Sequence, residues 1–218
     1  MDFLRQLDIL DPSKHRDRPI TVIGAGGIGA ALVVALAKTG FEKITVFDFD
    51  TIEEHNIPNQ LLPMSIGDAT TVGTYKVLML SRLVWELTGV RITPVAMRYT
   101  NQPLGEIVIA AVDSLDARRA IWEQVAQSMD TTLFIDGRMA ITSMDIYTID
   151  MLNEERVNLY PPTLEGTADE LPCTARATMF NAFIIAGHMA ALLVAYLNGW
   201  NYPWRFYYNV RSWKTLAL

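Results

Sequence analysis

Short apolar runs alternate with longer amphipathic segments along most of this chain. Residues 20–23 and 43–48 are short and rich in β-branched side chains, as are strands that are covered on both faces. The segments 29–39 and 76–87 instead repeat apolar residues at helical spacing. Strands that alternate with helices in this way predict an α/β fold with an open, mostly parallel sheet and right-handed crossovers.

The same alternation continues in the second half of the sheet. We expect strands at residues 91–97, 106–112 and 132–135, with a helix at residues 116–129. Residues 144–150 begin an antiparallel extension of the sheet. The expected fold is therefore a doubly wound, mostly parallel sheet with an antiparallel C-terminal part.

Two segments after residue 150 depart from this pattern. Residues 153–172 contain five acidic residues and three prolines, which predicts a loop or lid. Residues 174–198 are apolar on all sides and approach the length of a membrane span. Asn181 and His188 interrupt the apolar run, so we expect a core helix that also packs against a second subunit.

A glycine motif follows the first predicted strand. Gly24, Gly26 and Gly29 have the G-x-G-x-x-G spacing of a Rossmann-like turn, with Gly27 inside it, and such a turn brings a phosphate close to the backbone. Asp48 ends the next predicted strand about twenty residues later, where a carboxylate can bind ribose hydroxyls. Together they indicate an adenine-nucleotide site at the carboxyl ends of the strands, and the spacing alone favours NAD.

The residues after Asp48 indicate another kind of nucleotide chemistry. Asp48 and Asp50 form an Asp-x-Asp at the end of the second predicted strand. Four separately placed motif residues follow: Asn56, Gln60, Gly73 and Lys76. Further along, Asp113 ends an apolar strand and is followed by Arg118. These motifs resemble those of the ThiF/MoeB family of ubiquitin-activating-type adenylyltransferases, over roughly residues 3–200.

The resemblance implies a set of roles. Lys76 would lie near the ATP triphosphate, and Asp113 would contact ATP and Mg²⁺ as a metal ligand. Arg5, in an N-terminal Phe-Leu-Arg-Gln segment, would reach the nucleotide of a partner subunit in a homodimer. The expected nucleotide contacts are Gly24, Gly26, Gly27, Gly29, Asp48, Asp50, Asn56, Gln60 and Lys76.

Two departures from the family pattern bear on chemistry. Asn59 stands where the family has a phosphate-binding arginine, and Arg138 or Arg5 are the candidates to replace that charge. The chain has one cysteine and therefore no Cys-x-x-Cys pair, so we expect no structural zinc.

That cysteine, Cys173, allows two interpretations. In some members of the resembling family, a cysteine at this junction carries the activated acyl group as a thioester or persulfide conjugate. Arg176 and a helix N-terminus would favour the thiolate here. The alternative is a small buried side chain without a chemical role, since adenylation itself needs no cysteine.

Composition limits the remaining possibilities. The chain has 218 residues, half of them hydrophobic, which suits a single domain over residues 1–218: a Rossmann-like core at 1–150 and a crossover loop, helix and tail at 151–218. The formal net charge of −6 gives no basic surface for nucleic acid. One cysteine and the absence of a signal-like N-terminus favour a cytoplasmic protein that is not bound to membrane.

We therefore expect an ATP- and Mg²⁺-dependent adenylyltransferase. The resemblance implies that it activates the C-terminal carboxylate of a small ubiquitin-like or sulfur-carrier protein as an acyl-adenylate. A nucleotide- or partner-binding scaffold without catalytic activity is the main alternative, suggested by Asn59. An NAD-dependent oxidoreductase has only the glycine motif in its favour, because no catalytic Tyr-Lys or His-Asp set is recognisable.

Overall fold

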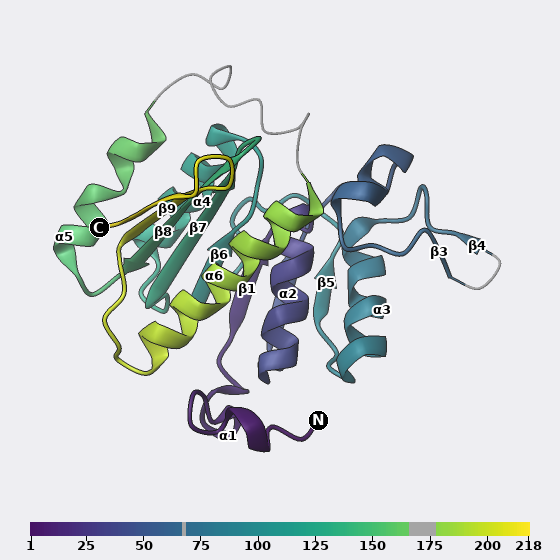
Figure 1. Cartoon of the computed structure of the whole chain (residues 1–218), viewed down its shortest axis with the longest axis horizontal. Helices are drawn as coiled ribbons and strands as arrows, with labels where there is room; N and C mark the ends of the chain where they lie inside the picture. Colours follow the sequence, from purple (N-terminus) through teal and green to yellow (C-terminus); the bar gives the residue numbers. More distant parts are fainter. Residues whose placement is uncertain (67–68, 166–177) are drawn as a thin grey trace.

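The computed structural model describes residues 1–66, 69–165 and 178–218. Its main sheet has eight strands in the order β10-β9-β8-β7-β6-β1-β2-β5 (Figure 1). These strands are β1 (Ile20–Ile23), β2 (Ile44–Phe47), β5 (Thr93–Val95), β6 (Ile107–Ala110), β7 (Leu133–Met139), β8 (Ser143–Asp150), β9 (Arg205–Asn209) and β10 (Lys214–Ala217). A separate two-stranded sheet pairs β3 (Ser65–Ile66) with β4 (Ala69–Thr70).

The pairing of the strands changes from parallel to antiparallel at β7. Strands β5, β2, β1, β6 and β7 pair in parallel, whereas β8, β9 and β10 pair antiparallel. Residues at the middle of the sheet are in register, with Val22 opposite both Val46 and Ile109. The predicted fold class is confirmed: a doubly wound, mostly parallel sheet with an antiparallel C-terminal extension.

Helices cover both faces of this sheet. The α-helices are α1 (Pro12–His15), α2 (Gly27–Thr39), α3 (Lys76–Thr88), α4 (Leu115–Gln127), α5 (Glu154–Leu159) and α6 (Met179–Leu197), and the 3₁₀ segments are η1 (Leu4–Gln6), η2 (Glu54–Asn59) and η3 (Pro161–Leu164). Helices α2, α3 and α6 pack in one hydrophobic cluster, and α4 packs in a second cluster with Tyr160 and Leu164. Each strand in the middle of the sheet is therefore buried on both faces.

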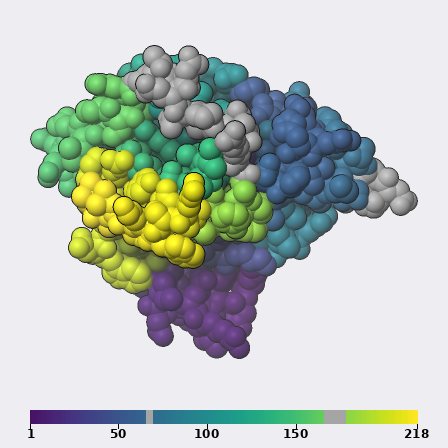
Figure 2. Space-filling model, turned by 45° about the horizontal axis from the view of Figure 1, so that its top comes forward, coloured from purple at the N-terminus to yellow at the C-terminus, as the bar shows by residue number. Residues whose placement is uncertain are grey.

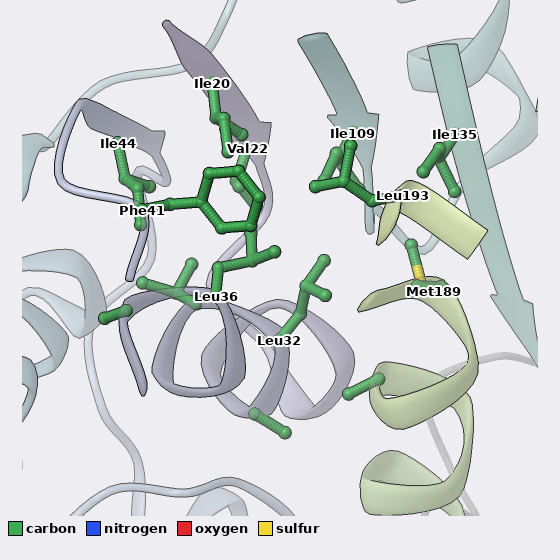
Figure 3. Packing of buried hydrophobic residues seen from close by; sticks show 14 of the residues in the cluster. Ile20, Val22, Leu32, Leu36, Phe41, Ile44, Ile109, Ile135, Met189 and Leu193 are labelled. Carbon is green, nitrogen blue, oxygen red and sulfur yellow. The ribbon is translucent and has the colours of Figure 1, made fainter. Parts of the chain in front are cut away.

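The larger cluster lies between the parallel strands and the helices α2 and α6. Leu32 and Leu36 of α2 lie beneath the strands, and Met189 and Leu193 of α6 approach the neighbouring strands (Figure 3). All four side chains are fully buried. Burial of each such side chain stabilises the fold by about 1.5–3 kcal/mol, which explains why these segments are so strongly apolar.

Helix α6 is, among the described residues, the one helix long and apolar enough to cross a membrane. It packs along α2 and against β7 and β8, and Ile185, Met189 and Leu193 form its buried stripe. Gly137 makes room for Met189, because a Cβ at this glycine would lie 2.5 Å from the methionine sulfur. These contacts are those of a core helix, while Phe180 and Phe183 remain exposed on its outer side.

Several predicted boundaries change in the structure. Residues 153–172 were expected to form a loop, but α5 and η3 occupy residues 154–164, so that prediction is wrong for this part. Asn153 caps α5, its side chain accepting a hydrogen bond from the Arg156 amide, and Pro161 begins η3. Residues 166–177 lie outside the described part of the chain.

The N-terminal segment lies at the amino ends of the strands. The Gln6 side-chain amide donates to the carbonyl of Thr39, the last residue of α2. Asn198, just after α6, donates to the carbonyl of Ile9. The segment (purple) is therefore held at the lower edge of the molecule, and η2 (blue) lies at the opposite edge (Figures 1 and 2).

Candidate nucleotide site

A cavity of about 1010 Å³ opens at the carboxyl ends of β1, β2 and β6. Its lining includes most of the site residues predicted from the motifs: Gly24, Gly26, Gly27, Asp48, Asp50, Asn56, Gln60, Lys76 and Asp113. This is the edge at which open α/β sheets bind their ligands. Tertiary structure thus brings together residues that are up to 89 positions apart, from Gly24 to Asp113.

The glycine turn between β1 and α2 forms one wall. Gly24 has a φ of +102°, and a Cβ there would lie 2.5 Å from the carbonyl oxygen of Ala111. A Cβ at Gly29 would lie 1.9 Å from the carbonyl oxygen of Gly24. Among the described residues, no neighbouring atom lies within 4 Å of a Cβ placed at Gly26, the N-cap of α2. Two glycines therefore serve packing, while Gly26 leaves open space where the α2 N-terminus faces the cavity.

Asp48 connects the end of β2 to this turn. Its Oδ2 accepts a hydrogen bond from the Ala25 amide at 2.6 Å, and its Oδ1 accepts one from the Asp50 amide at 2.8 Å. Burial raises the pKa of Asp48, and these two amide hydrogen bonds partly oppose that increase. The carboxylate is thus held at the edge of the cavity, where ribose hydroxyls could donate to it.

Lys76 begins α3 and points into the cavity. Its amide donates to the Asp50 carbonyl at 2.9 Å, and its Nζ lies 2.9 Å from Asp50 Oδ2. The lysine side chain is 9% exposed and that of Asp50 is 48% exposed. The cavity therefore contains a nearly buried ammonium group whose partner carboxylate faces solvent.

The 3₁₀ segment η2 forms the opposite wall. Asn56 accepts a hydrogen bond from the Glu53 amide at 3.0 Å, as half of a capping box. Gln60 Oε1 is buried and meets no hydrogen-bond donor in the described part of the chain. Asn59 also lines the cavity, so the family arginine is replaced by an amide inside the site. Asn56 thus has a structural use as a capping residue.

Asp113 lies in the connection between β6 and α4. It is exposed, and Ser114 after it caps α4 by accepting a hydrogen bond from the Ala117 amide at 3.2 Å. No group of three or more potential metal-ligating side chains occurs among the described residues. A lone carboxylate suits Mg²⁺, which keeps several waters and takes further oxygens from bound phosphates.

Two features of the site were missed by reasoning from sequence. Arg98 lies 4.0 Å above the ring of Phe49, and both residues line the cavity beyond Asp48. Asp136, in the middle of β7, is fully buried and bonded to Arg118, which also lines the cavity. A buried carboxylate is unusual without a partner, so the acidic Asp136 within an apolar strand was the sequence signal for a buried ion pair.

Two predicted residues lie away from the cavity, and a third is outside the described part of the chain. Arg5 belongs to η1, in the N-terminal segment at the amino ends of the strands, and does not line the cavity of its own chain. Arg138 binds Asp136 and the carbonyl oxygen of Thr163 and does not line the cavity, so it does not replace the charge missing at Asn59. Cys173 lies outside the described residues.

The arrangement combines four chemical capacities at one edge of the sheet. A helix N-terminus can bind phosphate, and Asp48 can bind ribose. Lys76 can stabilise negative charge, and the carboxylate of Asp113 can hold a hydrated divalent cation. These groups suit a nucleoside triphosphate and a reaction in which charge develops on its phosphates.

Comparison with known sequences finds a family model and curated relatives. The family model described as "ThiF family" matches residues 6–216. The NEDD8-activating enzyme E1 catalytic subunit of Dictyostelium discoideum is 35% identical over 113 residues, covering 49% of this chain and 25% of that protein. The molybdopterin-synthase adenylyltransferase of Salmonella typhimurium is 33% identical over 109 residues, covering 48% of this chain and 41% of that protein.

Solved structures show the same fold. E. coli MccB in complex with MccA superposes with a TM-score of 0.72 at 16% identity, covering 95% of this chain and 65% of that chain. MccB has also been solved with ATP, at a TM-score of 0.70 and 15% identity. The chain thus spans less than half the length of these two curated relatives and about two thirds of the MccB chain.

Proposed function

Because this chain belongs to the ThiF family, we propose that it is an ATP-dependent adenylyltransferase. Its substrate would be the C-terminal carboxylate of a small ubiquitin-like or sulfur-carrier protein, and its product an acyl-adenylate. The names of two relatives support this class, since one is a NEDD8-activating subunit and the other a molybdopterin-synthase adenylyltransferase.

The observation that carries the proposal is the position of Lys76 relative to the glycine turn. The lysine ammonium and the N-terminus of α2 face the same cavity, and Asp48 and Asp113 line its rim. A dehydrogenase needs the turn and a ribose-binding carboxylate but not a buried ammonium at the phosphate end. The combination favours chemistry on the phosphates over hydride transfer.

In the proposed reaction, a carboxylate oxygen attacks the α-phosphorus of ATP. The bond from that phosphorus to the bridging oxygen of pyrophosphate breaks, and pyrophosphate leaves with the electron pair. Lys76 offsets the negative charge that develops on the phosphates, and the turn and Asp48 position the nucleotide. Mg²⁺ bound through Asp113 would contribute further positive charge.

Several further properties are proposed together with this assignment. We propose a cytoplasmic homodimer in which Arg5 contributes to the site of the partner subunit. We retain the expectation that no zinc is bound and that neither membrane nor nucleic acid is a partner. For Cys173, both a thioester role and a structural role remain compatible with the proposal, because the adenylation step does not use it.

The test is ATP–pyrophosphate exchange with candidate carrier proteins, preceded by thermal-shift measurements. We expect ATP with Mg²⁺ to stabilise the protein and NAD to leave the melting temperature unchanged. Stabilisation by NAD alone would contradict the assignment. Exchange activity that requires an intact C-terminal carboxylate on the carrier would support it directly.

A scaffold that binds nucleotide without catalysis is the second candidate. The observation in its favour is Asn59, which lines the cavity in place of an arginine. Such a protein would be stabilised by ATP but would form no adenylate with any carrier. Replacement of Asn59 by arginine should then leave exchange absent, whereas in an active enzyme it should change the rate.

A further inference from the structure

A buried polar network lies beneath the floor of the cavity, on the side of the sheet that α4 covers. At its centre is Asp136 of β7, which is completely inaccessible to solvent. Its Oδ1 binds Arg118 of α4, and its Oδ2 accepts hydrogen bonds from Arg138 at 2.6 Å and from the Tyr160 hydroxyl at 2.9 Å. Both carboxylate oxygens therefore have donors.

Arg118 extends the network to the backbone of the site. Besides Asp136, its guanidinium binds the carbonyl oxygen of Val112 and, at 3.2 Å, that of Gly137. The arginine side chain is 3% exposed. A planar guanidinium can bind a carboxylate and two carbonyls at once, which an ammonium group on a flexible chain cannot do in the same geometry.

Val112 immediately precedes Asp113, so this contact bears on the proposed magnesium ligand. The connection from β6 to α4 is held at its start by the Ala111 amide, which donates to the Ile23 carbonyl at 2.8 Å. It is held at its end by the Ser114 cap. Between these points, the contact of Arg118 with the Val112 carbonyl holds the backbone next to Asp113.

We propose that Asp136 is a positioning residue for the nucleotide site: through Arg118 it fixes the backbone on which Asp113 is presented to Mg²⁺ and the phosphates. This rests on the proposed function for the identity of the ligand. It goes beyond that function in assigning a role to a buried residue that does not line the cavity. Asp136 acts on the site without touching substrate.

The charges explain why the carboxylate is needed. A buried guanidinium without a counter-charge is costly, so the Asp136 carboxylate beside Arg118 stabilises it in its position. Burial raises the pKa of Tyr160, which keeps this phenol protonated as a donor to Asp136. Arg138 and Tyr160 thus orient Asp136, whereas Arg118 connects it to the Val112 carbonyl.

Two readouts separate this role from a general structural one. The first is amide hydrogen exchange of the nucleotide-free protein over residues 111–118, where the amides of Ala111, Ala117 and Arg118 are hydrogen bonded. The second is ATP affinity by calorimetry, with Mg²⁺ and with EDTA. We expect Asp136→Asn to accelerate exchange in this segment by about tenfold. We expect it to weaken ATP binding by about 10- to 100-fold with Mg²⁺, and little in EDTA.

Arg118→Lys is the second variant, because Asp136→Asn removes the counter-charge of the buried Arg118 and of the partly buried Arg138 and is at risk of misfolding. The lysine retains the charge but cannot hold Asp136 and both carbonyls together, so it should reproduce both effects. Tyr160→Phe is the matched control, since it removes one hydrogen bond to Asp136 and leaves Arg118 in place. This control should melt earlier, but its exchange in this segment and its response to Mg²⁺ should match the wild type.

The outcomes are distinct. Normal exchange at residues 111–118 in folded Arg118→Lys or Asp136→Asn would overturn the proposal, as would equal acceleration in Tyr160→Phe. Equal losses of ATP affinity with Mg²⁺ and with EDTA would also overturn it. If the wild type bound no ATP, the proposed function would fail, and the exchange measurement would still decide the role of Asp136.

Discussion

Lys76 and Asp50 form an ion pair inside the cavity, with Nζ and Oδ2 2.9 Å apart. Asp50 lies three residues after the end of β2 at Phe47, and Lys76, 26 residues further along the chain, is the first residue of α3. The pair therefore connects the loop after β2 to the first residue of α3 at one wall of the cavity. It also holds the ammonium group within the cavity in the protein without nucleotide.

Lys76→Ala should leave the fold intact and remove most of the activity. Asp50 is 48% exposed, so its carboxylate remains hydrated when the lysine is lost. The expected loss is roughly 2–4 kcal/mol of transition-state stabilisation, on the scale of removing one positioned charge-stabilising donor. The measurement is ATP–pyrophosphate exchange with the cognate carrier, and the exposed Lys43→Ala is the control. Equal rates in the two variants would exclude this role of Lys76.

Asp113→Ala should abolish adenylate formation without changing the melting temperature of the nucleotide-free protein. The side chain is exposed at the cavity rim, so its removal costs the fold little. Stabilisation by ATP should then no longer depend on Mg²⁺. Asp130→Ala, another exposed aspartate, serves as the control. Full exchange activity in Asp113→Ala would show that the metal is held elsewhere.

Two glycines of the same motif should respond differently to alanine. Gly26→Ala adds a methyl group to open space, so the protein should fold normally but bind ATP poorly. Gly24→Ala combines a φ of +102° with a 2.5 Å approach to the Ala111 carbonyl, so it should destabilise the fold itself. Urea denaturation and ATP calorimetry on both variants distinguish these effects. Normal ATP binding by Gly26→Ala would show that the phosphates do not bind at this part of the turn.

The raised pKa of Asp48 predicts a pH dependence with a definite sign. Because burial raises this pKa in the folded state, the neutral carboxyl favours folding. That contribution is full below the ordinary carboxyl pKa and is lost as the pH rises through the raised pKa. ATP binding runs the other way, since ribose hydroxyls donate best to the ionised carboxylate.

We therefore expect ATP affinity to fall as the pH is lowered through the raised pKa of Asp48. The measurement is calorimetry of ATP over a pH series, and 2′,3′-dideoxy-ATP is the control because it lacks the ribose hydroxyls. Both nucleotides titrate alike at their phosphates, so the difference between them isolates the ribose contact. Parallel pH curves for the two nucleotides would argue against ribose binding by Asp48.

The outer side of α6 should form a two-fold interface. Phe183 is 52% exposed on a helix whose inner side is buried in the core. In Figure 2 the start of α6 (yellow-green) lies beside the C-terminal strands (yellow) on one face of the molecule. Light scattering should give twice the chain mass of 24.4 kDa, and Phe183→Glu should give a monomer. Leu152→Glu, at an 84% exposed site outside α6, should remain dimeric.

The same dimer allows a test of Arg5, which does not line the cavity of its own chain. Arg5→Ala subunits mixed with Asp113→Ala subunits should recover part of the activity, because one site of the mixed dimer then has both residues. Verified mixed dimers without activity would confine Arg5 to a local role. A monomeric wild-type protein would contradict the dimer and the contribution of Arg5 together.

The sequence alone determined the parallel core and most of the site. Local sequence patterns predicted β1, β2, β6 and the helices between them. Each of these strands is apolar over its whole length, because helices cover both faces of the sheet. The glycine spacing and Asp48 sit on consecutive elements, so short-range geometry suffices to bring them together. Lys76 and Asp113 came from motifs that carry their own spacing.

Tertiary structure decided what depends on contacts between distant elements. Asp136 and Arg118 are 18 residues apart on different elements, and only the packing of α4 on the sheet makes them partners. Asn153 and Pro161 start α5 and η3 in a segment whose composition indicated a loop, because helix ends are set by single capping residues. The sequence made Arg138 a candidate for the site, but in the structure its side chain binds Asp136 and Thr163 and does not line the cavity. Burial and partner choice are properties of the folded chain, and no local pattern contains them.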